Sequence, residues 1–149
     1  MPGYGIVGKD QGAGLLPWSF VAERMAAAHN YWVSSTSRDR KPHAAPVWGL
    51  WHEDSFYFST GQRSRKGRNF GANPAVVVHL ESGDEVVILE GKVEEITDKD
   101  LLKALDKAYR AKYGTGLIGP GLIYRLHPQR GFAWREADFT ESATRWTFK

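Results

Sequence analysis

The spacing of hydrophobic residues changes at residue 31 and divides a helical segment from a long β region. Before this point, apolar residues recur three and four positions apart, which predicts a helix that begins at Pro17 and extends to Asn30. After it, apolar and polar residues alternate, as in strands that bury one face. The alternation predicts strands at residues 31–36, 42–52, 55–59, 75–81, 85–96, 122–127 and 131–134, with a last short strand at 145–148.

A second helix interrupts the strands late in the chain. Thr97 supplies a capping hydroxyl, acidic residues follow in the first turn, and one face of the segment is apolar. The residues of that face are Leu101, Leu102, Leu105, Ala108 and Tyr109. The pattern is typical of a helix that packs on one side and is solvated on the other.

Links of hairpin length join most of the predicted strands, and this connectivity decides the fold class. It predicts a mainly β protein of six to seven antiparallel strands, with one N-terminal helix and one late inserted helix. Such a chain forms a Greek-key or meander barrel instead of a β-α-β sheet. Gly91 lies in the middle of the longest strand and predicts a bulge or bend at a corner of the barrel.

Length and composition indicate an ordinary globular protein. The 149 residues suffice for one domain, which we place at 17–149, and the glycine-rich residues 1–16 are expected to form a flexible arm. The absence of cysteine excludes disulfides, thiolate metal sites and a thiol nucleophile. No apolar run approaches the roughly 20 residues of a membrane helix, and the N-terminus does not read as a signal sequence. We therefore expect a cytoplasmic protein with no membrane partner.

One stretch between two predicted strands concentrates positive charge. Hydroxyl residues and glycines frame four cations that fall within six residues: Arg63, Arg65, Lys66 and Arg68. The stretch leads into one or two helical turns that Asn73-Pro74 ends, so unpaired N–H groups and the helix dipole reinforce the charged side chains. This composition predicts an anion pocket, and a solvated basic turn is the alternative.

The chain lacks the common patterns of side-chain catalysis. Its five histidines are not spaced as a metal pair on one element, and it has neither a nucleophile elbow nor a Walker sequence. A net charge of only +3 argues against a nucleic-acid surface. A phosphate-type pocket without an acid or nucleophile makes most sense if a bound cofactor supplies the reactivity.

Two motifs resemble the pyridoxamine phosphate oxidase-like superfamily. The first is Thr60-Gly61-Gln62-Arg63-Ser64-Arg65-Lys66-Gly67-Arg68 followed by Asn73-Pro74, and the second, one strand later, is Leu89-Glu90-Gly91-Lys92-Val93-Glu94. Their order and spacing match the family pattern over residues 30–97, with weaker similarity at 125–134. The resemblance implies a split β-barrel that binds a flavin or a deazaflavin.

The resemblance also implies which residues bind the cofactor. Arg65 and Lys66 are expected to contact its phosphate. Hydroxyl or backbone donors are expected from Ser59, Thr60 and Ser64.

A different strand and a second subunit are expected beside the ring system. The segment that lies along the ring in this family corresponds here to Pro46, Val47 and Trp48, although plain strand packing is the alternative for Trp48. In this family two subunits pair, and both contribute residues that line the cofactor site. Trp146 or Trp134 is therefore expected to reach across a homodimer interface.

Departures from the oxidase pattern bear on the choice of cofactor. Val86 stands where the oxidase has a glutamine that touches the flavin, and the C-terminal signature for pyridoxal phosphate is missing. Arg63 and Arg68 add charge that suits the phosphodiester and oligoglutamate tail of the deazaflavin coenzyme F420 better than the phosphate monoester of FMN. We therefore expect an oxidoreductase that transfers hydride between F420 and a small organic substrate, with no side chain assigned to catalysis. The alternatives are an FMN-dependent oxidase or reductase and a cofactor-binding protein without turnover.

Overall fold

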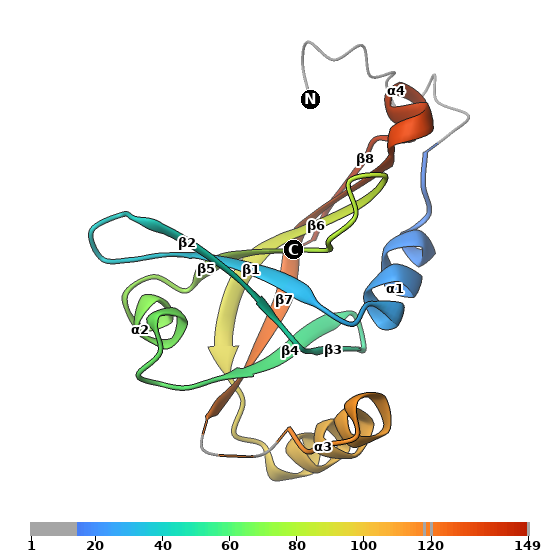
Figure 1. Cartoon of the computed structure of the whole chain (residues 1–149). Helices are drawn as coiled ribbons and strands as arrows, with labels where there is room; N and C mark the ends of the chain where they lie inside the picture. Colours follow the sequence, from blue (N-terminus) through green and yellow to red (C-terminus); the bar gives the residue numbers. More distant parts are fainter. Residues whose placement is uncertain (1–14, 118, 120, 149) are drawn as a thin grey trace.

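The structure is a computed structural model that describes residues 15–117, 119 and 121–148 (Figure 1). Its strands are β1 (Tyr31–Thr36), β2 (Pro42–Val47), β3 (Leu50–His52), β4 (Ser55–Thr60), β5 (Ala75–His79), β6 (Glu85–Glu95), β7 (Leu122–Arg135) and β8 (Thr144–Thr147). Its helices are α1 (Trp18–Ala27), α2 (Arg65–Ala72), α3 (Lys99–Tyr113) and α4 (Phe139–Ser142), with a 3-10 turn at Glu136–Asp138. Most of the arm predicted for residues 1–16 lies outside the described residues.

All strands belong to one antiparallel sheet that curls strongly. Seven strands follow one another in the order β2-β1-β5-β6-β7-β4-β3, and β8 pairs with β7 outside this path. The two ends of the path, β2 and β3, are joined only by Trp48 and Gly49. Three Cα–Cα steps span at most about 11 Å, so the two edges of the sheet must meet at this joint. The sheet therefore forms a barrel that is split between β2 and β3, which confirms the mainly β barrel predicted from the sequence.

Two predicted strand boundaries are wrong. Residues 42–52 were predicted as one strand, but the chain leaves the sheet at Trp48 and Gly49 and re-enters it at the opposite edge. Alternation of side chains cannot show this change of partner, because it continues through the joint.

The second error concerns β7, which was predicted as two strands separated by a turn around Pro128. The structure has one strand, with Glu90 opposite Arg130 and Gly91 opposite Pro128, so that Gln129 forms a bulge. A bulge tolerates a proline because the ladder hydrogen bond is already lost there. A Cβ on Gly91 would lie 2.7 Å from Leu126 Cδ1 and 2.8 Å from the His127 carbonyl oxygen. Of the bulge or bend predicted at Gly91, the bulge is confirmed by the register shift between Glu90 and Gly91, and close packing requires glycine there.

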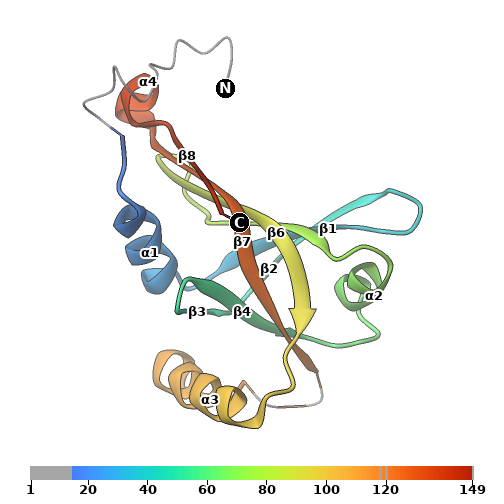
Figure 2. The same cartoon turned by 180° about the vertical axis from the view of Figure 1, so that it is seen from behind.

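The core has two parts, one inside the barrel and one outside it. Aromatic and aliphatic side chains of β1, β4, β6 and β7 fill the interior, and α1 adds Phe20, Val21 and Met25. On the outer surface, α3 packs Leu105 and Tyr109 against β3, β4 and β7. Strand β4 is consequently buried on both faces from Ser55 to Phe58. Figure 2 shows α1 and α2 on opposite sides of the barrel and α3 below it.

Among the helices of the described residues, none combines the length and apolarity needed to cross a membrane.

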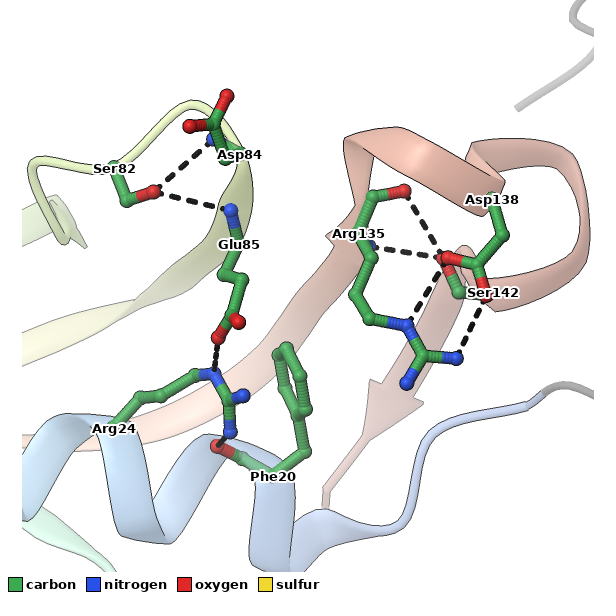
Figure 3. Close-up of polar contacts among 8 residues, drawn as sticks. All are labelled: Phe20, Arg24, Ser82, Asp84, Glu85, Arg135, Asp138 and Ser142. Carbon is green, nitrogen blue, oxygen red and sulfur yellow. Dashed lines mark hydrogen bonds and ion pairs between the residues drawn. The ribbon is translucent and has the colours of Figure 1, made fainter.

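Polar contacts at one end of the barrel fix the orientation of α1 and the end of β7 (Figure 3). Arg24 forms an ion pair with Glu85 at the start of β6, and its guanidinium carbon lies 3.4 Å from the centroid of the Phe20 ring. Arg135 donates to both carboxylate oxygens of Asp138, at 3.0 and 2.7 Å. Exposed pairs of this kind contribute roughly 0–1 kcal/mol each, so they set geometry more than stability.

The carboxyl end of α3 holds the joint between β2 and β3. The N–H of Gly49 donates to Tyr113 Oη at 3.0 Å, and Tyr113 Oη lies 2.8 Å from the carbonyl oxygen of His29. Lys112 Nζ donates to the Gly49 carbonyl at 3.2 Å and to Tyr31 Oη at 2.7 Å. Because Gly49 is buried, these side chains supply partners that no strand provides.

We expect Tyr113→Phe to lower the free energy of unfolding by about 1–3 kcal/mol, because it leaves the buried N–H of Gly49 without an acceptor. Urea unfolding monitored by circular dichroism measures the change. Tyr109→Phe is the matched control: it removes the same atom from the same helix, and within the described part of the chain the Tyr109 hydroxyl has no hydrogen-bond partner. Equal losses in the two variants would contradict the role given to Tyr113.

Candidate functional site

The basic stretch between β4 and β5 folds into a capped turn at the start of α2. Ser64 is the N-cap residue, and its Oγ accepts from the N–H of Gly67 at 3.1 Å and donates to the carbonyl of Gly61 at 2.6 Å. Thr60 Oγ1 lies 2.9 Å from Ser64 Oγ and donates to it, since the Ser64 proton is already used. The hydroxyl of Ser64 therefore shapes the turn and has no proton left for a ligand.

Two backbone donors at the start of α2 have no hydrogen-bond acceptor within the described part of the chain. The N–H of Gly67 is capped by Ser64 Oγ, and the N–H of Arg68 bonds to the Ser64 carbonyl. The N–H groups of Arg65 and Lys66 have no intrahelical acceptor. They add to the charges of their own side chains and to the positive end of the helix dipole.

Apolar and amide side chains on the opposite face of α2 determine which way its cations point. Phe70 is buried, and its ring packs against Phe58 and Tyr124 with centroids 5.8 and 5.0 Å away. Asn69 is also buried and donates to Ser35 Oγ on β1 at 3.1 Å. Arg65 and Arg68 consequently face solvent and Lys66 is half-buried. Burial lowers the pKa of Lys66 from its ordinary value.

Gly67 allows the turn to close onto the helix. A Cβ at this position would lie 2.5 Å from the carbonyl oxygen of Gly61 and 2.6 Å from that of Gln62, and both contacts are with backbone. Any side chain at residue 67 would force the turn away from α2.

The structure brings a residue to this turn that was not predicted for the site. His43 lies on β2, and its ring is close enough to Arg65 and Lys66 that their positive charges, together with burial as the largest cause, lower its pKa. In the alternation of β2 it shares the half-buried phase with Ala45 and Val47. The sequence feature that could have identified His43 is a polar residue at a position of β2 where the alternation places inward-facing side chains.

The predicted phosphate residues lie together, but their surroundings differ. Ser59 and Thr60 end β4 beside the turn, and Arg63 is exposed within it. Arg68 lies in an open groove of about 360 Å³ between α2 and the β1–β2 turn, lined also by Ser37, Arg38 and Asp39. The groove therefore places Arg68 of α2 and Arg38 of the β1–β2 turn along one opening, together with the acidic Asp39.

The predicted ring segment runs along β2 away from the turn. Because β2 is an edge strand, half of its backbone groups have no strand partner and can face a ligand. Pro46 is exposed, while Val47 packs against the core. Trp48 lies at the joint, 42% exposed, and stacks on Tyr113 with ring centroids 4.7 Å apart.

Trp146 is not brought to the turn within one chain. It lies on β8 and makes an edge contact with Trp18 at 5.2 Å. Both views show β8 at the end of the barrel away from α2 (Figures 1 and 2). The role expected for Trp146 beside a cofactor would need a second subunit and stays a prediction.

A second cluster of perturbed ionisable groups belongs to the joint. Burial lowers the pKa of Lys112 to about 8 and raises the pKa of Tyr31 and Tyr113. Perturbed pKa values often mark active sites. Tyr113 and Lys112 instead form hydrogen bonds with Gly49, and Tyr113 also donates to the His29 carbonyl. Tyr31 accepts from Lys112 and donates to the Met25 carbonyl, so the cluster holds the joint.

Barrel, edge strand and helix start together define a split barrel with a basic, capped turn near an open β edge. The chain belongs to the pyridoxamine 5'-phosphate oxidase family, whose sequence profile matches residues 20–140. The resemblance found in the sequence motifs is thereby confirmed. A comparison with curated proteins gave no match.

Solved structures share the fold at low sequence identity. The conserved hypothetical protein Rv2991 from Mycobacterium tuberculosis is 18% identical, with a TM-score of 0.72 over 80% of this chain and 85% of that one. A heme binding protein from Mycobacterium smegmatis is 16% identical, with a TM-score of 0.71 over 89% of this chain and 59% of that one. An F420 reductase is 21% identical, with a TM-score of 0.60 over 73% of this chain and 93% of that one. The TM-scores establish a common fold, and at identities this low the comparison supports no conclusion beyond the fold.

We expect Gly67→Ala to destabilise the protein and to disrupt the turn, because its Cβ would meet two backbone carbonyls. Thermal unfolding should show a clear fall in melting temperature. The matched control is Gly71→Ala in the same helix, where a Cβ meets nothing within 4 Å. That variant should gain up to about 1 kcal/mol, because alanine favours helix over glycine. Equal effects in both variants would contradict the close approach at Gly67.

Proposed function

We propose that the protein is an oxidoreductase that binds the deazaflavin coenzyme F420 and transfers hydride between the coenzyme and a small organic substrate. The observation that carries the proposal is the start of α2, where the backbone N–H groups and the side chains of Arg65 and Lys66 lie close enough to His43 of the edge strand β2 to act on its charge. The coenzyme supplies the hydride chemistry, and the protein supplies position and electrostatics.

The residues of the turn would hold the coenzyme phosphate. Arg65 and Lys66 would donate charge-assisted hydrogen bonds, and Ser59 and Thr60 end β4 next to the turn, with Thr60 Oγ1 against Ser64. Ser64 acts indirectly, since it fixes the turn. The ring system would lie along Pro46, Val47 and Trp48, where the open edge of β2 offers backbone donors and acceptors.

The distribution of charge supports F420 over FMN. Arg63 and Arg68 are exposed on either side of the Arg65–Lys66 pair, and Arg68 borders the groove that continues toward Arg38. A phosphodiester with an oligoglutamate tail can engage charges spread over this length, whereas a phosphate monoester engages one point. The neighbour described as an F420 reductase supports the same choice.

The coenzyme site would be completed by a homodimer. Within one chain the β2 edge is open, and Trp146 lies at the other end of the barrel. We propose that the partner subunit closes the site and that Trp146 reaches it across the interface. No side chain of this chain is assigned as proton donor.

A cofactor-binding protein without turnover is the second candidate. It is favoured by the neighbour described as a heme binding protein, which has the same fold. Binding of coenzyme without hydride transfer to any quinone or enone acceptor would support this candidate.

We expect the wild-type protein to bind F420 more tightly than FMN in a fluorescence titration, and Lys66→Ala to weaken F420 binding at least about tenfold. A hydrogen bond to a charged group contributes roughly 1.5–3 kcal/mol, and about 1.4 kcal/mol corresponds to tenfold. Lys107→Ala, which removes an exposed lysine of α3, is the matched control and should leave affinity unchanged. Tighter binding of FMN would favour the alternative of an FMN-dependent oxidase or reductase. Failure of both coenzymes to bind would refute the proposal.

A further inference from the structure

The ring of His43 lies close enough to the start of α2 for Arg65 and Lys66 to act on it, and one of its nitrogens has no hydrogen-bond partner among the described residues. Of all buried side-chain nitrogens and oxygens in the described residues, His43 Nδ1 alone has no hydrogen-bond partner. Leaving such a group unpaired costs roughly 1–3 kcal/mol, and native proteins rarely do so without a reason. The atom therefore indicates a missing acceptor or donor at this point.

The neighbours of His43 show what kind of group is missing. His43 pairs with Ser35 across β1 and β2, and Ser35 Oγ already accepts from Asn69 of α2. The charged groups that act on the ring are Arg65 and Lys66, both cations. A negatively charged acceptor would satisfy Nδ1 and at the same time neutralise the repulsion among three basic side chains.

Burial and nearby positive charge disfavour the protonated form of His43 in the free protein. Burial and the two cations lower its pKa, and burial also lowers the pKa of Lys66. An anion bound among these groups reverses the effect on the imidazole, because an opposite charge favours the protonated form. The pKa of His43 must then be higher in the complex than in the free protein.

We propose that His43 is a third basic ligand of the phosphate group held at the start of α2, and that it takes up a proton when that phosphate binds. The protonated ring donates Nδ1–H to a phosphate oxygen, beside Arg65 and Lys66. This inference rests on the proposed coenzyme site and adds to it a residue and a pH dependence.

Linkage fixes the sign of the pH dependence. Affinity is constant below the pKa of His43 in the free protein, weakens as pH rises toward its pKa in the complex, and becomes constant again above it. Each unit by which binding raises the pKa corresponds to a tenfold loss of affinity across this window.

The first test is isothermal titration calorimetry with F420 in two buffers of different ionisation enthalpy, which counts the protons taken up. Wild-type protein should take up more protons than His43→Asn, whose amide can occupy the Nδ1 position but cannot titrate. Subtracting the variant removes any titration of the coenzyme itself. His52→Gln, on the opposite edge strand β3, is the control and should behave as wild type. Equal proton uptake in wild type and His43→Asn would overturn the inference.

A second measurement keeps the inference separate from the choice of coenzyme. The imidazole signal of His43, assigned from its loss in His43→Asn, is followed by NMR against pH with and without F420 and with and without inorganic phosphate. A pKa that rises with either ligand supports the inference. If phosphate raises it but F420 does not bind, the coenzyme proposal fails while the role of His43 stands. An unchanged pKa with both ligands would overturn the role of His43.

Discussion

The two-residue joint at Trp48 and Gly49 constrains the whole sheet. It connects the first and last strands of the sheet path, so the strands between them must curl until both edges meet. The joint has no strand partner of its own, and α3 supplies its hydrogen bonds through Tyr113 and Lys112. The outer helix and the closure of the barrel therefore depend on each other, and β2 is left as an open edge beyond the joint.

The open edge and α2 create the candidate site because α2 is anchored by its apolar face. Phe70 packs in the core and Asn69 donates a hydrogen bond to β1. These contacts orient α2 so that the cations of its first turn face away from the core. Gly67 and the hydroxyl of Ser64 then close the turn against the helix. Positive charge is thus placed by packing interactions that involve no charge at all.

The same fold serves proteins with different ligands, so the site must carry the functional argument. A structural neighbour is described as a heme binding protein and another as an F420 reductase, and both are below 25% identity to this chain. This chain carries basic residues at the start of α2, Arg38 and Arg68 in the adjoining groove, and a buried imidazole nitrogen without a hydrogen-bond partner among the described residues. These features favour an extended anionic ligand.

The sequence alone determined most of the strand and helix content, the bulge at Gly91 and the basic turn, because each follows from local spacing or composition. The motifs around Arg65, Lys66 and Glu90 also sufficed to identify the family. The break at Trp48 and Gly49 and the continuity of β7 through Pro128 could not be predicted, because alternation of side chains does not reveal which strand is the neighbour. Only the tertiary structure placed His43 beside Arg65 and Lys66 and Trp146 away from them, because distances between segments far apart in the chain are set by how the sheet closes.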